Sequence, residues 1–272
     1  MFRKVLVGTG AAAFWAIIFA ILIALNRGER GDLLNSVQKK GVLVVATSAD
    51  YPPFEYQDLK NGKDTTSGSD VELAKIIAKK LGVRLEIQNM SFNTVLLSVS
   101  TGKADLGISA ISATPERQQS FDFTDVYYTP TNKLLIKKSN FAKFKQKSDL
   151  SGAKIGAQKG SIQESVVQDQ IPDAKEIGLA SIPDLVNEVK MGSMSGVMIE
   201  GIIGENYISN DPDLTFADLP ITSDASQSYS IAVPKGNPAM KQRINQIIRE
   251  LKSDGTIDAL IVKNSKEAGK NE

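Results

Sequence analysis

Short apolar runs and amphipathic segments alternate along the first half of the chain. Compact apolar runs predict buried strands, and apolar positions that recur every three or four residues predict helices packed on a sheet. This succession of strand, helix and strand predicts a parallel sheet with crossover helices. The strands are expected at 42–46, 85–87 and 104–108, and the helices at 69–81 and 92–100.

The same pattern then begins again, which predicts a second lobe of similar α/β construction. We expect further strands at 132–137, 154–157, 175–178, 196–199 and 229–233, and helices from 161, at 183–191 and at 240–251. We interpret the second lobe as an insertion in the first, with a hinge between them that closes on a ligand. The predicted limits are 31–130 for the first part of lobe 1, 131–225 for lobe 2, and 226–272 for the completion of lobe 1 and a C-terminal tail.

Two short sequences predict where helices begin. Ser69 is followed by Glu72, and Ser161 by Glu164. This is the spacing of a capping box, in which a hydroxyl and a carboxylate satisfy the free N–H groups of the first turn. We also expect Asp70 to cap its own helix.

A long uncharged segment near the N-terminus predicts contact with a membrane. Residues 5–25 carry no charge and follow Arg3 and Lys4. About 20 apolar residues cross a bilayer as a helix, whereas the apolar part of a secretory signal usually has about 7–15. The length favours a retained anchor within 1–30, with its N-terminus in the cytoplasm. A cleaved signal is the alternative, and both place the rest of the chain outside the membrane.

The composition excludes several kinds of chemistry. The chain has no Cys and no His, which excludes disulfides, thiol nucleophiles, a Ser-His-Asp triad and most zinc sites. The 32 basic and 31 acidic residues give a net charge of +1, which offers no argument for a nucleic-acid partner. An enzyme would have to rely on carboxylates, Lys or Tyr. We expect no catalytic residue, no metal, no cofactor and no nucleic acid.

The segment 109–117 carries the clearest candidate chemistry. It follows an expected strand and places several hydroxyl residues before Arg117. A guanidinium matches a carboxylate with paired donors, and ligands of parallel sheets lie beyond the C-terminal ends of the strands. Arg117 is therefore a candidate to bind a small ligand with an anionic group, such as an amino acid. A surface ion pair with Glu116 or Asp122 is the alternative.

Five segments, in this order and spacing, resemble the extracellular solute-binding proteins of polar amino-acid ABC importers. They are 47–55, 68–74, 102–106, 109–117 with the nearby 121–128, and 156–161. The resemblance extends from about residue 41 to about residue 263. It implies a two-lobed α/β fold of the type II periplasmic-binding-protein class and a cleft that holds an L-amino acid.

The resemblance implies roles at the charged ends of that ligand. Arg117 would hold the carboxylate, helped by backbone N–H groups of Ser112, Ser161 and Ile162. Ser161 opens a helix, and helix N-termini attract anions. Glu200 stands where these proteins usually have an Asp that pairs with the ligand ammonium.

Other positions would meet the ligand side chain. Tyr51 and Phe92 match aromatic positions that flank it, although either residue could belong to the core. Glu55 and Gln158 are candidates to recognise its polar end.

Two further matches concern the ammonium and the kind of ligand. A backbone carbonyl of Ser109 or Ala110 would accept another ammonium proton. Segments 48–55 and 157–164 look closest to arginine-type binders, which predicts arginine or another basic or polar amino acid as the ligand.

The same resemblance implies partners and leaves alternatives open. The partners would be an ABC permease and its cytoplasmic ATPase. The ligand-binding part would be a monomer outside the cell, membrane-anchored through residues 5–25 or secreted. A dehydratase-like enzyme on the same fold, with Glu200 or Glu55 as its acid, is one alternative. A membrane-tethered amino-acid-sensing domain is the other.

Overall fold

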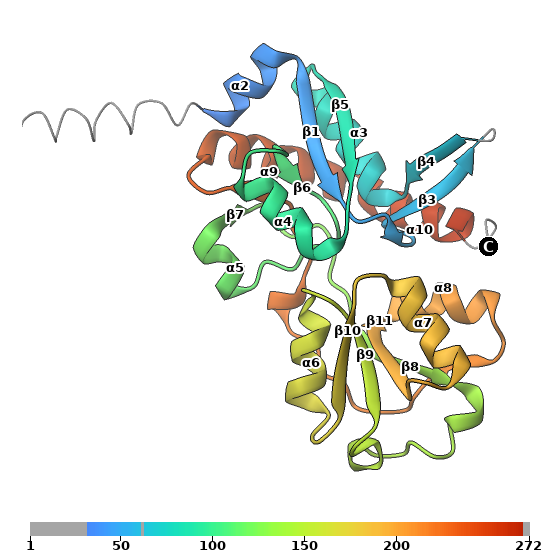
Figure 1. The fold of residues 1–272 in the computed structure, drawn as a ribbon. Helices are drawn as coiled ribbons and strands as arrows, with labels where there is room; N and C mark the ends of the chain where they lie inside the picture. The colour runs from blue at the N-terminus through green and yellow to red at the C-terminus, as the bar shows by residue number, and fades with distance from the viewer. Residues whose placement is uncertain (1–31, 61–62, 269–272) are drawn as a thin grey trace, which may run out of the picture.

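The computed structural model describes residues 32–60 and 63–268. Two α/β lobes face each other, each built around a five-stranded sheet (Figure 1). The expected membrane segment 5–25 lies outside the described residues. Among the helices of the described part, none has the length and hydrophobicity that a bilayer crossing requires.

The first lobe combines the N-terminal and C-terminal parts of the chain. Its strands are β1 (Val42–Thr47), β5 (Arg84–Asn89), β6 (Leu106–Gly107), β7 (Phe121–Phe123) and β13 (Ala232–Pro234). Its helices are α2 (Leu33–Lys40), α3 (Ser69–Leu81), α4 (Phe92–Ser100), α5 (Pro115–Ser120), α9 (Pro238–Ser253) and α10 (Thr256–Ala268). The strand order is β5-β1-β6-β13-β7, with β1 parallel to β5 and β6, and β13 antiparallel to β6 and β7.

The second lobe is formed by the stretch of chain between β7 and β13. Its strands are β8 (Asn132–Lys137), β9 (Lys154–Gln158), β10 (Lys175–Leu179), β11 (Gly196–Glu200) and β12 (Leu214–Phe216). Its helices are α6 (Ile162–Gln170), α7 (Ile182–Met191) and α8 (Gly201–Asn210), with short 3-10 turns at Lys138–Asn140, Lys147–Leu150 and Ala225–Gln227. The strand order is β10-β9-β11-β8-β12, and β9 is parallel to both β10 and β11.

A small three-stranded sheet extends from the end of β1. It contains β2 (Asp50–Tyr51), β3 (Glu55–Lys60) and β4 (Lys63–Ser67), which pair in antiparallel fashion. Within it, Tyr51 lies opposite Glu55. The sheet therefore places two residues predicted to bind ligand side by side at one edge of the cleft.

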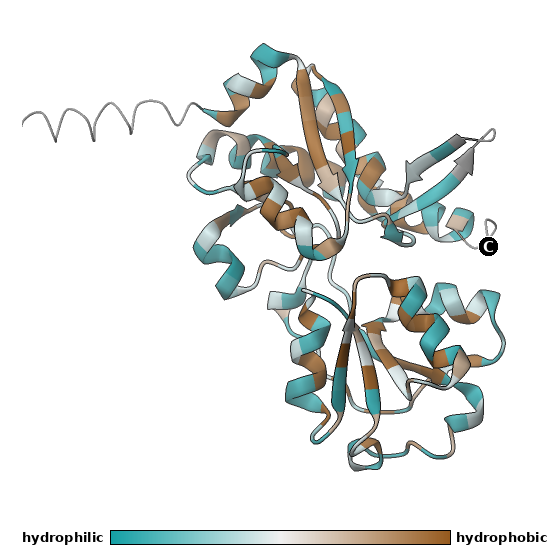
Figure 2. Cartoon of the chain, viewed as in Figure 1, coloured by the Kyte–Doolittle hydropathy of each residue, from teal (hydrophilic) through white to brown (hydrophobic). Residues whose placement is uncertain are grey.

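The apolar faces of the helices pack on the sheets, as the sequence pattern predicts. In α3, the residues of the expected face, from Val71 to Leu81, are buried, and Gly82 ends the helix in the left-handed conformation. Figure 2 shows the same arrangement in both lobes, with apolar residues on the inner strands and polar residues on the outer helix faces.

The expected caps of α3 are wrong. Gly68 is the N-cap, with a φ of +125° that favours glycine, and Ser69 is already helical. The Ser69 hydroxyl instead donates to the Pro53 carbonyl at 3.4 Å. The Asp70 carboxylate turns away from its helix and accepts from the Ala110 N–H at 2.9 Å. The close contact between Gly68 and Phe54 fixes this entry into the helix and prevents the capping geometry.

Helix α6 has the Ser161 half of the expected capping box but not the Glu164 half. The Ser161 hydroxyl accepts from the Gln163 N–H at 3.3 Å and caps the helix. The Glu164 carboxylate accepts from the Gly160 N–H at 2.8 Å, one residue earlier than a capping box requires.

Replacement of Gly68 by Ala should destabilise the first lobe strongly. A Cβ at this position would overlap the Phe54 carbonyl oxygen, and the φ of Gly68 is strained for any L side chain. We expect Gly68→Ala to lower the free energy of unfolding by about 3 kcal/mol or more, measured by urea denaturation. Gly82→Ala is the control, because its φ is also positive but its Cβ would meet no atom within 4 Å. We expect that variant to lose only about 1 kcal/mol, and equal losses in the two variants would contradict the packing argument.

Candidate functional site

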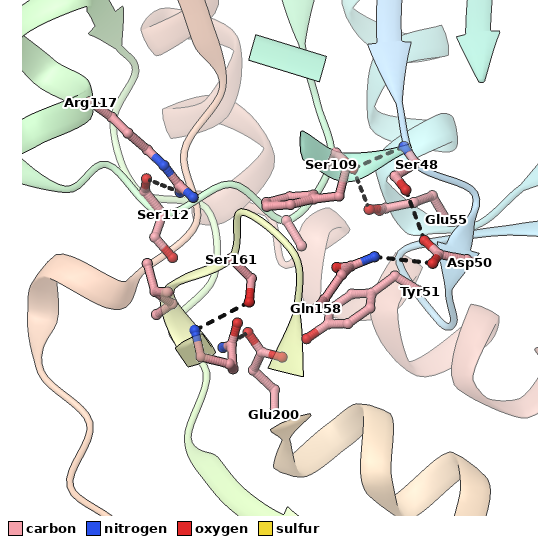
Figure 3. Close-up of a pocket in the computed structure, with 14 residues that line it drawn as sticks. Ser48, Asp50, Tyr51, Glu55, Ser109, Ser112, Arg117, Gln158, Ser161 and Glu200 are labelled. Atoms are coloured by element: carbon pink, nitrogen blue, oxygen red, sulfur yellow. Dashed lines mark hydrogen bonds between the residues drawn. The ribbon is translucent and has the colours of Figure 1, made fainter. Parts of the chain in front are cut away.

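A pocket lies between the two lobes (Figure 3). All eleven residues predicted from the sequence line it: Tyr51, Glu55, Phe92, Ser109, Ala110, Ser112, Arg117, Gln158, Ser161, Ile162 and Glu200. The structure therefore brings together residues from both lobes, at the positions where strands β1, β6, β9 and β11 end.

Arg117 extends from α5 toward the second lobe. Thr114 caps this helix, since its hydroxyl accepts from the Arg117 N–H at 3.2 Å. The guanidinium donates to the carbonyls of Ser112 at 2.8 Å and of Gly160 at 2.9 Å. Desolvation lowers the pKa of Arg117 to about 10, so the side chain remains cationic at neutral pH.

Of the two ion-pair partners given as the alternative for Arg117, Asp122 is wrong, whereas the charge of Glu116 raises the pKa of Arg117 but less than desolvation lowers it. Asp122 pairs with Lys235 at 3.3 Å and accepts from the Gly236 N–H at 2.8 Å. The Arg117 guanidinium also lies 5.8 Å from the centre of the Phe92 ring, within the range of a cation–π contact. The side chain is thus held at the pocket rather than on the outer surface.

The N-terminus of α6 lies on the opposite wall from Arg117. Ser161 and Ile162 line the pocket there, and the first N–H groups of a helix carry a partial positive charge. Arg117 donates to the carbonyl of Gly160, the residue just before this helix. A guanidinium and a helix N-terminus therefore converge, which is an arrangement suited to a carboxylate.

Glu200 is a buried carboxylate at the end of β11. Its Oε1 accepts from the Gln163 amide at 2.7 Å, whereas Oε2 receives no hydrogen bond of standard geometry from the described residues, although the Tyr229 hydroxyl lies near this carboxyl group and lowers its pKa. Burial raises the pKa of Glu200 to about 7. A buried carboxylate oxygen without a donor is costly unless a proton or a cation reaches it. Glu200 is therefore suited to a cationic group of the ligand.

Glu55 is a second buried carboxylate, on the side of the pocket away from Arg117 (Figure 3). Its Oε1 accepts from the Ser109 hydroxyl at 2.8 Å. The Ser109 oxygen in turn accepts from the Ser48 N–H at 3.0 Å. Oε2 of Glu55 receives no hydrogen bond from a donor in the described part of the chain. This end of the pocket also favours a cation.

Ala110 adopts an uncommon backbone conformation between the two ends. Its φ of +47° lies in the left-handed region, which a non-glycine residue adopts at a cost of about 1–2 kcal/mol. The Ala110 N–H donates to Asp70, which holds the turn in place. Strain of this kind is typical of functional sites.

Two aromatic rings complete the pocket. Tyr51 is buried and Phe92 is half-buried, and both line the cavity. The alternative that assigned them to the core alone therefore describes them incompletely. Their role as walls around a ligand side chain stays a prediction.

Three lining residues were not among the predicted ligand-binding residues: Ser48, Asp50 and Gln163. Asp50 is the most informative, because it joins the lobes. Its Oδ2 accepts from the Gln158 amide at 3.0 Å and from the Ile182 N–H at 3.1 Å, at the first residue of α7. Its Oδ1 accepts from the Ser48 hydroxyl at 2.8 Å. The sequence contains no local signal for this contact, because its partners follow more than 100 residues later.

Comparison with known proteins gives consistent similarities. A model of the bacterial extracellular solute-binding proteins, family 3, matches residues 43–267. The arginine-binding extracellular protein ArtP of Bacillus subtilis (strain 168) is 34% identical over 247 residues, which cover 90% of this chain and 92% of ArtP.

Solved structures agree with this match. The amino acid ABC transporter substrate-binding protein AbpA from Streptococcus pneumoniae Canada MDR_19A, bound to L-arginine, is 42% identical with a TM-score of 0.83. The alignment covers 88% of this chain and 99% of AbpA. The ancestral amino acid-binding protein AncCDT-1, a precursor of cyclohexadienyl dehydratase, is 31% identical with a TM-score of 0.77, over 85% of this chain and 98% of AncCDT-1. These structures confirm the two-lobed type II fold predicted from the sequence.

Removal of the Asp50 carboxylate should favour separation of the lobes. Asp50→Ala deletes two hydrogen bonds to the second lobe, one of them at a helix N-terminus. We expect the closed arrangement to lose about 2 kcal/mol, or about 30-fold in its population relative to an open one. Spin labels on introduced cysteines, one in each lobe, would report the distance by double electron–electron resonance, and the chain has no native Cys to interfere.

The matched control is Asp184→Ala. Asp184 lies in the first turn of the same helix but is exposed. We expect its distance distribution to equal that of the wild type. If Asp50→Ala also leaves the distribution unchanged, Asp50 does not hold the lobes together.

Proposed function

Because the chain belongs to family 3 of the bacterial extracellular solute-binding proteins, we propose that it captures L-arginine between its lobes and delivers it to an ABC permease. Two relatives support arginine rather than another amino acid: ArtP is named an arginine-binding protein, and the AbpA structure contains L-arginine.

The distribution of charge around the pocket carries the proposal. One end has the Arg117 guanidinium and the N-terminus of α6. Two buried carboxylates with incompletely satisfied oxygens, Glu200 and Glu55, lie elsewhere in the wall. L-Arginine carries one anionic and two cationic groups, which can pair with Arg117 and with Glu200 and Glu55. The third carboxylate of the pocket, Asp50, already accepts from Ser48, Gln158 and Ile182. Neutral amino acids lack the second cation.

In the proposed complex, Arg117 and the N–H groups of Ser112, Ser161 and Ile162 bind the ligand carboxylate. Glu200 accepts a hydrogen bond from the ligand ammonium, and a backbone carbonyl of Ser109 or Ala110 accepts another.

The ligand side chain then extends between Tyr51 and Phe92 toward Glu55 and Gln158. Gln158 belongs to the second lobe and Glu55 to the first, so a guanidinium between them would contact both lobes.

Capture by closure explains why the ligand must be enclosed. Charged hydrogen bonds are strong only where water is excluded, and excluding water requires both lobes. We propose that the lobes move about the two crossings of the chain, with limits at 31–130, 131–225 and 226–272 as predicted from the sequence. Contacts between the lobes, such as Arg117 to Gly160, would form on closure.

The partners follow from the family. We propose that the closed protein delivers its ligand as a monomer to a permease whose cytoplasmic ATPase drives import. We further propose that residues 5–25 hold the ligand-binding part at the outer face of the membrane.

We propose that the chain binds its ligand without altering it. ArtP and AbpA are both named as binding proteins, which supports this choice. The similarity to AncCDT-1, a precursor of cyclohexadienyl dehydratase, is the observation that favours an enzymatic alternative. Glu200 is a candidate acid for such chemistry, but it is assigned here to the ligand ammonium. Incubation with prephenate or arogenate should leave both compounds unchanged by mass spectrometry, and measurable turnover would overturn the proposal.

The proposed function is tested by ligand-induced stabilisation. A ligand that binds only the native state raises the melting temperature, and the rise grows with affinity. Among the twenty L-amino acids, L-arginine should therefore raise it most. Arg117→Ala should reduce its affinity at least about 100-fold, since the ligand carboxylate loses its charged partner in a desolvated site. Calorimetry of the variant measures this loss. Arg84→Ala, an exposed residue of β5, is the control and should bind as the wild type. Near wild-type affinity of Arg117→Ala would refute the assigned pocket.

A further inference from the structure

Two buried carboxyl groups lie next to each other behind one end of the pocket. Glu55 is 1% exposed and Asp70 is 2% exposed. Glu55 begins β3 and lines the pocket, whereas Asp70 belongs to α3 and lies behind it. The Asp70 N–H donates to the carbonyl of Phe54, the residue before Glu55, at 2.9 Å, and the consecutive residues Ser109 and Ala110 donate to Glu55 and to Asp70.

The donors around this pair are distributed unevenly. Asp70 Oδ2 accepts two hydrogen bonds, from the Ala110 N–H at 2.9 Å and from the Tyr127 hydroxyl at 2.7 Å. Glu55 accepts one, at Oε1, from the Ser109 hydroxyl. The single hydroxyl hydrogen of Ser109 must go to Glu55, because the Ser109 oxygen already accepts from the Ser48 N–H. The better-solvated anion is therefore Asp70, and Oε2 of Glu55 is the atom left for a proton.

The surrounding groups do not offset a second negative charge. The groups that face the pair are Asp50 from β2, Tyr127 from the segment after β7 and the Ser109 hydroxyl after β6. Asp50 is acidic and Tyr127 is neutral. Burial, then the Asp70 charge, raise the pKa of Glu55 well above its usual range, and burial raises the pKa of Asp70 to about 6. Two adjacent buried carboxyls without a cation cannot both ionise easily.

We propose that the Glu55–Asp70 pair holds one proton in the empty protein and releases it to solvent when a cationic ligand side chain contacts Glu55. Asp70 is then a positioning residue for specificity, because it touches Glu55 and not the ligand. The inference rests on the proposed function, in which the ligand is L-arginine. The balance is simple: the carboxyl group loses a proton to water, and the resulting carboxylate pairs with the guanidinium.

The exchange predicts a selectivity that changes with pH. Below the pKa of the empty pair, arginine must displace a proton, so its dissociation constant should rise up to about tenfold for each unit of falling pH. A ligand with a neutral side chain has no such cost, since the protonated Glu55 can donate to it. L-Citrulline is the matched probe, because its ureido group replaces the guanidinium and the rest of the molecule is the same.

The experiment is isothermal titration calorimetry of the full chain at about pH 7, in buffers of different ionisation enthalpy. The dependence of the measured heat on the buffer gives the number of protons released. Glu200 also has a raised pKa and faces the ammonium, but that group is common to both ligands. Its contribution cancels in the difference between arginine and citrulline. We expect arginine to release more protons than citrulline, up to one for each ligand bound.

Two variants assign the proton to the pair. Asp70→Asn keeps an oxygen that can accept from Ala110 and Tyr127 and removes the charge beside Glu55. We expect the pH midpoint of arginine affinity to shift down by about one unit. Glu55→Gln imitates the protonated state, so arginine should bind about 100-fold more weakly with no excess proton release, while citrulline changes only a few-fold.

The outcomes separate this inference from the function on which it rests. If arginine does not bind the wild type, the proposed function fails. If arginine binds but releases no more protons than citrulline, the proton on Glu55 is excluded. Should citrulline bind too weakly to measure, the Asp70→Asn midpoint decides, and an unshifted midpoint overturns the inference.

Discussion

Exclusion of water from charged groups is the constraint on which the rest of this structure depends. The pocket walls carry Arg117, Glu200 and Glu55, and each of these groups loses hydration between the lobes. A buried charge without a partner is costly, whereas a paired and hydrogen-bonded one is tolerated. Other parts of the chain compensate in part, through carbonyls on Arg117 and an amide on Glu200. In the proposed function, a ligand with the opposite charges completes this compensation.

The same constraint explains the contacts of the residues that hold the charged side chains in place. Asp70 connects α3 with the strained turn at Ala110, and at Gly68 the start of α3 passes close to the Phe54 carbonyl, next to Glu55. Asp50 satisfies the N-terminus of α7 from the other lobe. None of these contacts adds much apolar burial. Their effect is to fix where charge lies, so that the energetic cost of desolvation falls on the few groups that a ligand can reach.

The sequence predicted those parts that depend on local pattern or on family motifs. The buried face of α3 and the Ser161 cap follow from spacing along one helix. The eleven lining residues came from motifs at strand ends, which the fold necessarily gathers in one cleft. Helix α8 was not predicted, because Gly201 and Gly204 lower helix propensity. Gly204 is required there by the ring of Phe216, which a Cβ would overlap. A contact between distant segments produces no local sequence pattern, so this helix could not be predicted from spacing.

The two ends of the pocket differ in how far they can determine which amino acid is bound. In the proposed complex, Arg117, the α6 N-terminus and Glu200 meet the carboxylate and the ammonium, which all amino acids share. Discrimination must come from the other end, where Glu55, Gln158 and Asp50 lie (Figure 3). There the charge of a single carboxyl decides between a cationic and a neutral side chain. Because Asp70 controls that charge from behind the wall, selectivity could be altered without changing any atom that touches the ligand.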